Sequence, residues 1–482
     1  MAHREGGGDE RDAADLARLG YAQQLLREMG GFSNFALSFS IISILTGAVT
    51  LYGHGLSYGG PIVMTLGWPL VTVMTLFVAA SLAELASAYP TAGALYHWSA
   101  ILGGPGAGFF TAWLNTIGQF AITAGIDYGL AEILVSVLDL GTERGTVLEV
   151  YGLILFSHAA LNHVGMRVVA LCNTMSAWYH LAGVIALVTA LAVFAPKQPA
   201  SFLWTRHVST NDPFAYAFLV GLLQAQWTFT GYDASAHVTE ETKDPRRNAP
   251  WGIVLSVVVS GVAGYVMLLF VTLAIKDVGH TADAGSWAFV SVILEAVGGR
   301  LGRALVWMVL GAIWFCGLSS VTSNSRMLFA FARDGGLPSS PALASVSPRF
   351  RTPAKAVWVS VTMAYAVALW AKAYYAVVAL STIALYASYG LPILVGLRAR
   401  LRGEWTERGP WNLGRWSNLV NVVALAWIFV ISVLFVLPPN ELAGYTFAGC
   451  LVLIAIYWVT YMRARFVGPR LAPLSRPAAP SP

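Results

Sequence analysis

Repeated apolar stretches of membrane-crossing length are the feature that most constrains this chain. About 20 apolar residues in an α-helix cross the hydrocarbon core of a bilayer, and 12 stretches near that length can be found in the sequence. Charged residues make up only 11% of the 482 residues, whereas soluble domains carry about 25%. Because backbone polar groups inside lipid must be paired within helices or closed barrels, we predict an all-α protein with 12 transmembrane helices.

We place the 12 predicted spans by their apolar runs; the fourth and the ninth are the shortest. They are Ser33–Leu51, Pro61–Leu82, Ala107–Leu134, Val147–Asn162, Val169–Phe194, Pro213–Ala236, Ile253–Ile275, Leu305–Ala330, Ala356–Ala371, Ala376–Leu397, Leu419–Leu437 and Ala443–Met462.

The positions of Lys and Arg predict the orientation of these spans. An even number of spans puts both termini on one side, and 22 of the 29 Lys and Arg residues fall on that side. Cytoplasmic loops carry such an excess, so we expect cytoplasmic termini and a multi-pass protein of the plasma membrane. The basic residues are spread over many loops rather than gathered in one patch, which argues against a nucleic-acid partner.

The two ends of the chain lack long apolar runs. Residues 1–32 predict a cytoplasmic segment in which Asp15–Met29 forms a short amphipathic helix on the membrane surface. The tail, residues 464–482, is rich in proline and is predicted to be disordered. No metal-ligand or cofactor motif is found in the sequence, and the three cysteines are expected to be free thiols.

Glycine interrupts two of the apolar spans near their middles. One interruption is Thr46-Gly47 within Ser40–Leu51, and the other is Thr230-Gly231 within Leu222–Ala236. Backbone groups freed at bilayer depth must find protein, ion or solute partners. Two such interruptions in corresponding places of two half-chains are typical of the binding site of a secondary transporter.

Few polar residues lie within the spans, and each has a functional and a structural interpretation. Asp233 either caps the half-helix after the second interruption or contacts an amine or a cation. Gly231 either allows unwound backbone or close helix packing, and Trp227 is either a gate or an ordinary packed residue. Asp127 and Glu132 are five residues apart on one helix, so they cannot both face one narrow cavity.

Two further sets of residues concern coupling of transport to an ion and closure of an inner gate. His180 is either a proton carrier or a packing residue. Hydroxyls such as Ser319 and Ser320 either bond their own backbone or bind Na⁺. Acidic and basic residues in the runs Glu84–Gly93 and Glu240–Arg247 form either an inner gate or solvated loops.

Several long stretches resemble the amino acid–polyamine–organocation superfamily, in its amino acid/choline transporter branch. They occur in order over roughly residues 19–465 and include LGYAQQLLREMGGFSNFALSFSIISILTG, ELASAYPTAGALYHW, AITAGIDYGLAE, FTGYDASAHVTEETKDPRRNAP, FCGLSSVTSNSRMLFAFARDGGLP and GPWNLGRWSNLVN.

The resemblance implies a leucine-transporter-type core of two inverted five-helix repeats, with helices 1 and 6 broken. The repeats would be residues 33–195 and 213–397, followed by peripheral helices in residues 418–463. It places a solute carboxylate on backbone near Thr46-Gly47 and an amine near the carbonyls of Thr228–Gly231, with Trp227 as a gate. The superfamily often has Gly-Ser/Thr-Gly in the first helix, and Leu45 stands here in place of the first glycine.

The implied site residues fall into two groups. His180 lies where a proton-coupled relative has a lysine, so we predict an ion-coupling group of His180, Ser319 and Ser320. The predicted substrate-binding residues are Ser43, Thr46, Gly47, Ala48, Asp127, Trp227, Thr230, Gly231, Tyr232 and Asp233.

We therefore predict a secondary active transporter of amino acids or related amines such as γ-aminobutyrate, choline or polyamines. Its partners would be the solute, the bilayer and H⁺ or Na⁺, or a second solute in exchange; no cofactor is predicted. An amine channel or a membrane sensor is the alternative. No nucleophile–base pair or phosphate loop supports an enzyme, and we predict no catalytic residue.

Overall fold

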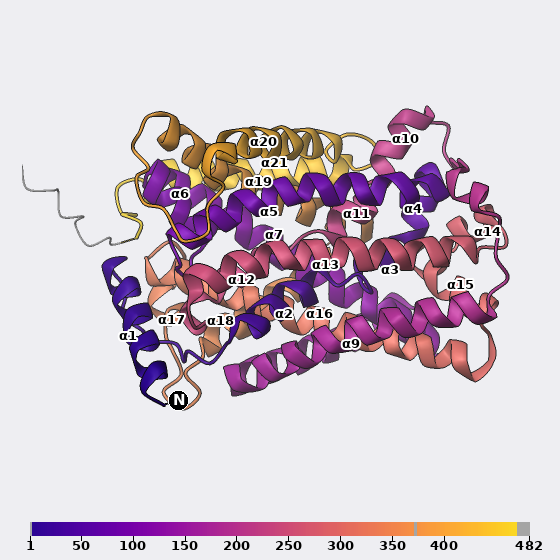
Figure 1. The fold of residues 1–482 in the computed structure, drawn as a ribbon, viewed down its shortest axis with the longest axis horizontal. Coiled ribbons are helices and arrows are strands. Elements are labelled where there is room, and N and C mark those ends of the chain that lie inside the picture. Colours follow the sequence, from indigo (N-terminus) through magenta and orange to yellow (C-terminus); the bar gives the residue numbers. More distant parts are fainter. Residues whose placement is uncertain (1, 371–373, 470–482) are drawn as a thin grey trace, which may run out of the picture.

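The computed structural model describes residues 2–370 and 374–469, and its regular structure there is helical, without a β-strand. Long helices run alongside one another between two ends of the bundle (Figure 1). α1, α6, α12 and α17 gather at one end, which we term the inner end, and α10, α14 and α15 lie at the other. The predicted all-α membrane fold is confirmed.

The first half of the chain forms both short and long helices. They are α1 (Ala2–Arg18), α2 (Gly31–Ile42), α3 (Gly47–Thr50), α4 (Tyr52–Gly59), α5 (Trp68–Ala88), α6 (Leu95–Gly103), α7 (Pro105–Val137), α8 (Arg144–Val164), α9 (Met166–Phe194), α10 (Phe214–Gly221), α11 (Leu223–Thr228) and α12 (Ala234–His237).

The second half contains α13 (Pro245–Leu273), α14 (Val278–Asp283), α15 (Ala288–Ala296), α16 (Gly299–Arg333), α17 (Ser340–Leu343), α18 (Ala354–Trp370), α19 (Tyr374–Leu401), α20 (Ser417–Leu434) and α21 (Glu441–Tyr457).

Ten helical segments in the described residues are long and apolar enough to cross a membrane. The other two predicted spans coincide with helices that fall short of this length. Pro213–Ala236 is divided among α10, α11 and α12, and Ala356–Ala371 corresponds to the 17-residue α18, with Ala371 outside the described residues. The division into two inverted repeats and a peripheral pair stays a prediction.

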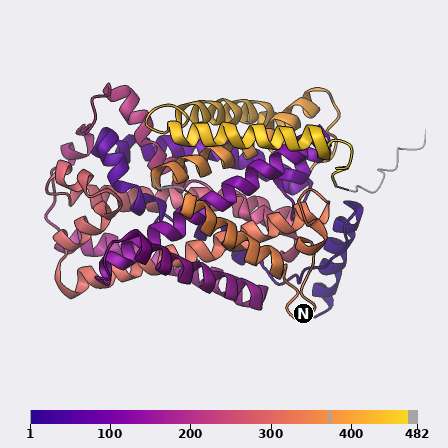
Figure 2. The same ribbon diagram turned by 180° about the vertical axis from the view of Figure 1, so that it is seen from behind.

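α7 lies at the centre of the bundle, where it packs against α19, α16, α8 and α18. Its middle is almost entirely buried from Leu114 to Ile126. α13 packs against both α2 and α5. α20 and α21 run side by side along one edge of the bundle in both views (Figures 1 and 2), and α21 leaves apolar side chains such as Leu453 exposed, as expected of a helix that faces lipid.

The predicted amphipathic helix at Asp15–Met29 is wrong. Helix α1 ends at Arg18, and Gly20 then adopts a φ of +86°. Residues 19–29, which we term the strap, follow in a turn and a non-helical segment. The backbone N–H groups of Glu28 and Met29 donate to the Glu241 carbonyl oxygen at 3.1 and 2.9 Å. Pairing with a second segment replaces the helix, a contact that local periodicity cannot reveal. Residues 470–482 of the predicted tail lie outside the described residues.

Candidate solute-binding site

The first interrupted span breaks between α2 and α3. α2 ends at Ile42, and Ser43 turns the chain with a φ of +29°. The Ser43 hydroxyl lies 2.6 Å from the Thr46 hydroxyl and 2.7 Å from Nε2 of His180, which lies on α9. The turn is therefore held by side chains at a depth where water is scarce.

The second interrupted span breaks between α11 and α12, and Gly231 there has a φ of +83°. Two tyrosines of α19 bond its freed backbone. The Tyr386 hydroxyl donates to the Phe229 carbonyl oxygen at 2.7 Å, and the Gly231 N–H donates to the Tyr389 hydroxyl at 3.2 Å. Pairing by a neighbouring helix is what makes unwound backbone tolerable inside a membrane.

The two breaks approach each other through their glycines. A Cβ on Gly47 would lie 2.3 Å from Oγ1 and 2.8 Å from Cα of Thr228. In the reciprocal contact, a Cβ on Gly231 would lie 2.2 Å from Cγ2 of Ile41. Glycine at both positions is therefore required for the approach, and at Gly231 also for the left-handed backbone.

A small central cavity lies between the breaks. Its volume is about 10 Å³, which is near the minimum that holds one water molecule. Four predicted site residues line it, namely Thr46, Gly47, Trp227 and Thr230, together with Ile41, Ile42, Ile122, Ile126 and Thr228. The structure therefore brings the two breaks to one place but leaves no room there for an amino acid.

Trp227 separates the central cavity from a second one. This outer cavity, of about 40 Å³, is lined by Gly125, Glu132 and Tyr374 among others. A Cβ on Gly125 would lie 3.1 Å from the Trp227 ring, and the Trp227 Nε1–H donates to the Ser381 hydroxyl at 3.0 Å. The indole therefore lies between the predicted site and the side of the bundle that bears Glu132.

Asp233 does not cap α12, although it lies at the N-cap position, since its side chain makes no capping hydrogen bond. Its carboxylate instead accepts from the Tyr389 hydroxyl at 2.7 Å and lies 3.1 Å from Nε2 of His237. The carboxylate is buried below the second break. Tyr232, beside it, contributes its carbonyl oxygen to a bond from the Ser38 hydroxyl at 2.8 Å.

The other predicted residues lie apart from the cavity wall. Asp127 is buried beside His158, with 3.1 Å between Oδ2 and Nδ1. The Ala48 carbonyl oxygen accepts from Gln224 at 3.4 Å. Ser319 donates to Oδ1 of Asn173 at 2.9 Å, and Ser320 lies 2.7 Å from the Thr123 hydroxyl. The structure thus joins His180 to the first break and gives the two serines partners of their own.

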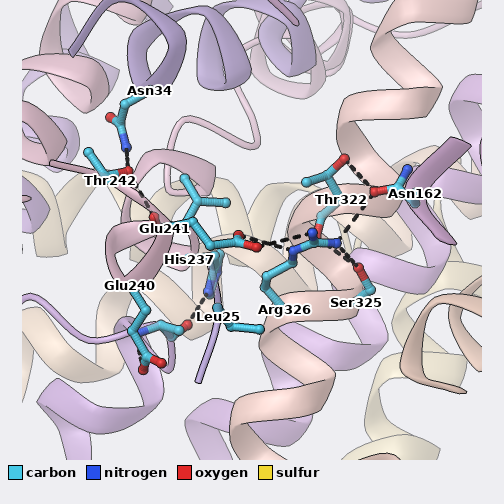
Figure 3. A network of polar contacts seen from close by, with 12 residues as sticks. Leu25, Asn34, Asn162, His237, Glu240, Glu241, Thr242, Thr322, Ser325 and Arg326 are labelled. Atoms are coloured by element: carbon cyan, nitrogen blue, oxygen red, sulfur yellow. Dashed lines mark hydrogen bonds and ion pairs between the residues drawn. The ribbon is translucent and has the colours of Figure 1, made fainter. Parts of the chain in front are cut away.

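Buried ion pairs lie at the inner end beneath the breaks. Glu240 and Glu241 are therefore not solvated, whereas Lys243, Asp244 and Arg247 of the same run are exposed. Figure 3 shows the carboxylate of Glu241 directed at Arg326, with both oxygens at 3.2 Å from guanidinium nitrogens. Arg326 also donates to the Asn162 side-chain oxygen at 3.4 Å. Burial raises the pKa of Glu241, and Arg326 acts against that shift.

A second pair lies beside the first. Arg333 binds both oxygens of Glu240 at 3.0 and 2.8 Å. Burial opposes ionisation of Glu240, but Arg333 outweighs it and holds the pKa of this carboxyl below its usual value. Asp334 accepts from the Tyr21 hydroxyl of the strap at 2.7 Å and lies 3.1 Å from Nε2 of His97. We term Tyr21, His97, Glu240, Glu241, Arg326, Arg333 and Asp334 the inner network.

Sequence reasoning missed the isoleucines of the cavity wall and the two tyrosines of α19. Apolar wall residues carry no signal that separates them from packing residues. Tyr386 and Tyr389 are three residues apart and so share one helix face, a spacing that marks a polar face in an otherwise apolar span. Tyr21 and Asp334, which are 313 residues apart, give no local signal at all.

Comparison with known proteins identifies the family of the chain. A sequence profile for amino acid permeases matches residues 30–461. Amino-acid permease BAT1 of Arabidopsis thaliana is 38% identical over 494 residues, covering 94% of this chain and 95% of the relative. The BAT1 homolog of Oryza sativa subsp. japonica is also 38% identical, covering 96% of each chain. A GABA-specific permease of Saccharomyces cerevisiae is 26% identical, covering 94% of this chain and 85% of the relative.

The matches extend over nearly the whole chain, both breaks included. They confirm the predicted superfamily and the predicted transport of amino acids across a membrane, and they point to a permease rather than an enzyme. The chain therefore belongs to the amino acid permease family.

Proposed function

We propose that the protein is a secondary active transporter that works by alternating access, with its solute held between the two breaks. The supporting observation is that residues of both breaks line one buried cavity, Thr46 and Gly47 from the first and Thr228 and Thr230 from the second. N–H and C=O groups there would meet the carboxylate and the amine of the solute. Neutral dipoles rather than full charges would then recognise a zwitterion.

The structure represents a closed form in this proposal. The central cavity holds about one water molecule, and the inner network blocks the route below it. Binding of a solute requires the contacts at Gly47 and Gly231 to loosen and Trp227 to move. Release at the inner end requires the ion pairs of the inner network to break and the strap to move away from them.

The first solute to test is γ-aminobutyrate, because a relative that covers most of the chain is named for it. Basic amino acids are the second class, since Asp233 and Glu132 are the acidic groups nearest the two cavities. A thermal-shift panel of amino acids and amines on the purified protein orders these candidates, because a ligand of the folded state raises its apparent stability.

Coupling to protons through His180 is part of the proposal. Its Nε2 contacts Ser43 at the first break, and its Nδ1 lies 2.8 Å from the Ser176 carbonyl oxygen. A change of charge on His180 would therefore act directly on the turn that borders the cavity. Uptake into liposomes driven by a pH gradient without Na⁺ tests this, and His180→Ala with undiminished proton-driven uptake would contradict it. Uptake that requires Na⁺ would instead favour the sodium alternative.

Orientation and location complete the proposal. The inner end carries both described chain ends and the basic loops, so we place it in the cytoplasm by the positive-inside rule, with the protein in the plasma membrane. Protease accessibility in intact cells checks this orientation, as does thiol labelling of cysteines engineered at either end.

The decisive test is counterflow in liposomes. Saturable exchange of labelled γ-aminobutyrate, or of the solute that the thermal-shift panel selects, supports a carrier, whereas a linear flux favours a channel. Gly47→Ala puts a methyl group into Thr228 and is expected to reduce counterflow at least about tenfold, equivalent to about 1.4 kcal/mol. Gly449→Ala on α21, where a Cβ meets nothing within 4 Å, is the matched control. Equal activity of the two variants would refute the site.

A further inference from the structure

A buried acid–base pair lies in the bundle, outside the walls of both cavities. Asp127 of α7 and His158 of α8 are both 0% exposed, and Oδ2 of the first lies 3.1 Å from Nδ1 of the second. Ionisable groups at bilayer depth are costly and mark ion or proton pathways. The proposed function does not use this pair.

The pair is incompletely bonded. Within the described part of the chain, Asp127 Oδ1 and His158 Nε2 have no hydrogen-bond partner. A buried pair that served only to fix helix packing would be expected to satisfy these atoms, because each unpaired buried polar group is destabilising. Both free atoms are sites where a proton can bind.

Within residues 2–370 and 374–469, no Lys or Arg side chain forms an ion pair with Asp127 to neutralise a carboxylate. The titratable groups that interact with Asp127 are Tyr151 of α8 and Cys316 of α16, and Tyr365 of α18 stacks on Tyr151. Phenol and thiol groups are ordinarily uncharged at neutral pH. A carboxylate beside a neutral imidazole has a net charge of −1, and one added proton makes such a pair neutral.

The surroundings suit the protonated form. The Trp314 ring centroid lies 5.1 Å from that of His158, and indole rings attract cations. A Cβ on Gly317 would lie 1.9 Å from Asp127 Oδ1 and 2.6 Å from His158 Cε1, so only glycine allows α16 to approach the pair this closely. Glycine weakens a helix interior relative to alanine, a cost that this contact explains.

Sequence neighbours of the pair and of Gly317 connect it to the first break, one on α7 and one on α16. Ile126, next to Asp127, lines the central cavity. Cys316, next to Gly317, donates its S–H to the Ile41 carbonyl oxygen on α2 at 3.2 Å. A change of charge and spacing at the pair would therefore reach both the cavity wall and the broken helix.

We propose that Asp127 and His158 together form a proton-binding site of this permease, separate from His180, whose protonation biases the arrangement of α7 and α16 against the first break. One proton from water binds the pair as a unit and takes its net charge from −1 to 0. The inference rests on the proposed function, because the protonation matters only if the chain transports.

The test compares Asp127→Asn and His158→Gln with wild type in liposomes. Wild-type uptake of labelled γ-aminobutyrate, or of the solute that the thermal-shift panel selects, is measured at pH values from roughly 5 to roughly 8 and should change by up to about tenfold per unit for one titrating proton. D127N removes the carboxylate from the pair, so its pH profile should be flatter than that of wild type, with the part that His180 contributes remaining. H158Q should shift the pH profile. Ser157→Ala is the matched control, because it removes a bond between α8 and Trp314 without removing a titratable group.

A second measurement needs no solute. Infrared difference spectra of the purified chain between the same two pH values report protonation of carboxyl and imidazole groups. D127N and H158Q should each remove bands that S157A keeps. Unchanged spectra together with a wild-type pH profile in both variants would overturn the inference. Absence of counterflow in wild type would instead overturn the proposed function. The spectra alone would then show whether Asp127 and His158 bind a proton.

Discussion

At the two breaks, α2–α3 and α11–α12 meet through glycine, hydroxyl and backbone groups, whereas at the inner end the contacts are arginine–glutamate pairs. The first region holds its turns with Ser43, Tyr386 and Tyr389 and has no ion pair across the cavity wall described above. The second holds two bidentate pairs, Arg326–Glu241 and Arg333–Glu240.

The difference follows from what each region must do. A site of neutral dipoles can hold a zwitterion without binding it so tightly that it cannot leave. A gate must instead differ strongly in free energy between its closed state and a state in which its residues are separated but still buried. Ion pairs provide this difference, because a buried charge that loses its partner is very unfavourable. Once separated, the same side chains can be solvated at the end of the bundle. The following variants test this contrast, from the largest expected effect to the smallest.

Arg326→Met should have the largest effect on stability. It leaves Glu241 buried without its partner, and breaking such a pair is destabilising by about 3–5 kcal/mol. Thermal unfolding in detergent measures the loss. Glu241→Gln combined with R326M should recover much of it. Arg402→Ala, which breaks a pair whose side chains are 55% and 61% exposed, is the control and should change stability by less than about 1 kcal/mol. Equal losses of stability in R326M and R402A would show that the buried ion pair stabilises the protein no more than the exposed one.

Gly231→Ala should abolish transport with a smaller loss of stability. The left-handed backbone alone disfavours a Cβ by about 1–2 kcal/mol, and the new methyl group would overlap Ile41. Counterflow measures the effect. Adding Ile41→Ala removes the overlap but not the backbone strain, so the double variant should regain only part of the activity. Full recovery would show that the backbone conformation is unimportant.

Acid should affect the inner end through Glu240. Its pKa in the folded protein lies below the ordinary value of 4.5. Its contribution to the free energy of unfolding is therefore complete above pH 4.5 and is lost as pH falls through the lowered value. Glu240→Gln should be less stable than wild type at neutral pH, and the two should converge as pH falls below 4.5. Unfolding curves at several pH values measure this, and a constant difference between the two proteins would contradict the assignment.

Ser381→Ala should give the smallest effect. It removes one hydrogen bond from the Trp227 indole, which is worth about 0.5–1.5 kcal/mol. If Trp227 is a gate, the variant should release solute faster with little change in unfolding temperature. Tracer efflux from preloaded liposomes measures this rate, and Trp227→Phe, which lacks the N–H, should match it. Wild-type efflux in both variants would leave Trp227 as a packing residue only.

Sequence predicted the membrane class and both breaks because these depend on local composition. Apolar runs and central glycines are visible without any knowledge of contacts. The breaks lie within a few residues of Thr46-Gly47 and Thr230-Gly231, as predicted. The strap and the Tyr21–Asp334 contact could not be predicted, since they join segments that are far apart in the chain. Nor could the partner of Asp127, because His158 lies on another helix and only the packing of α7 on α8 brings it near.

The strap gives the first thirty residues a mechanical role. Two of its backbone N–H groups bond Glu241, its Gln23 side chain donates to the Glu240 carbonyl oxygen at 2.7 Å, and its Tyr21 ring lies 3.9 Å from the Arg333 guanidinium carbon. In the proposed cycle, opening of the inner end separates the strap from Glu240, Glu241 and Arg333. A fluorescent label near α1 should therefore report each transport cycle. Deletions through Met29 should change the rate of the cycle more than deletions that stop before Tyr21, which remove the Asp12 contacts with Arg27 and Asp244 but keep the strap.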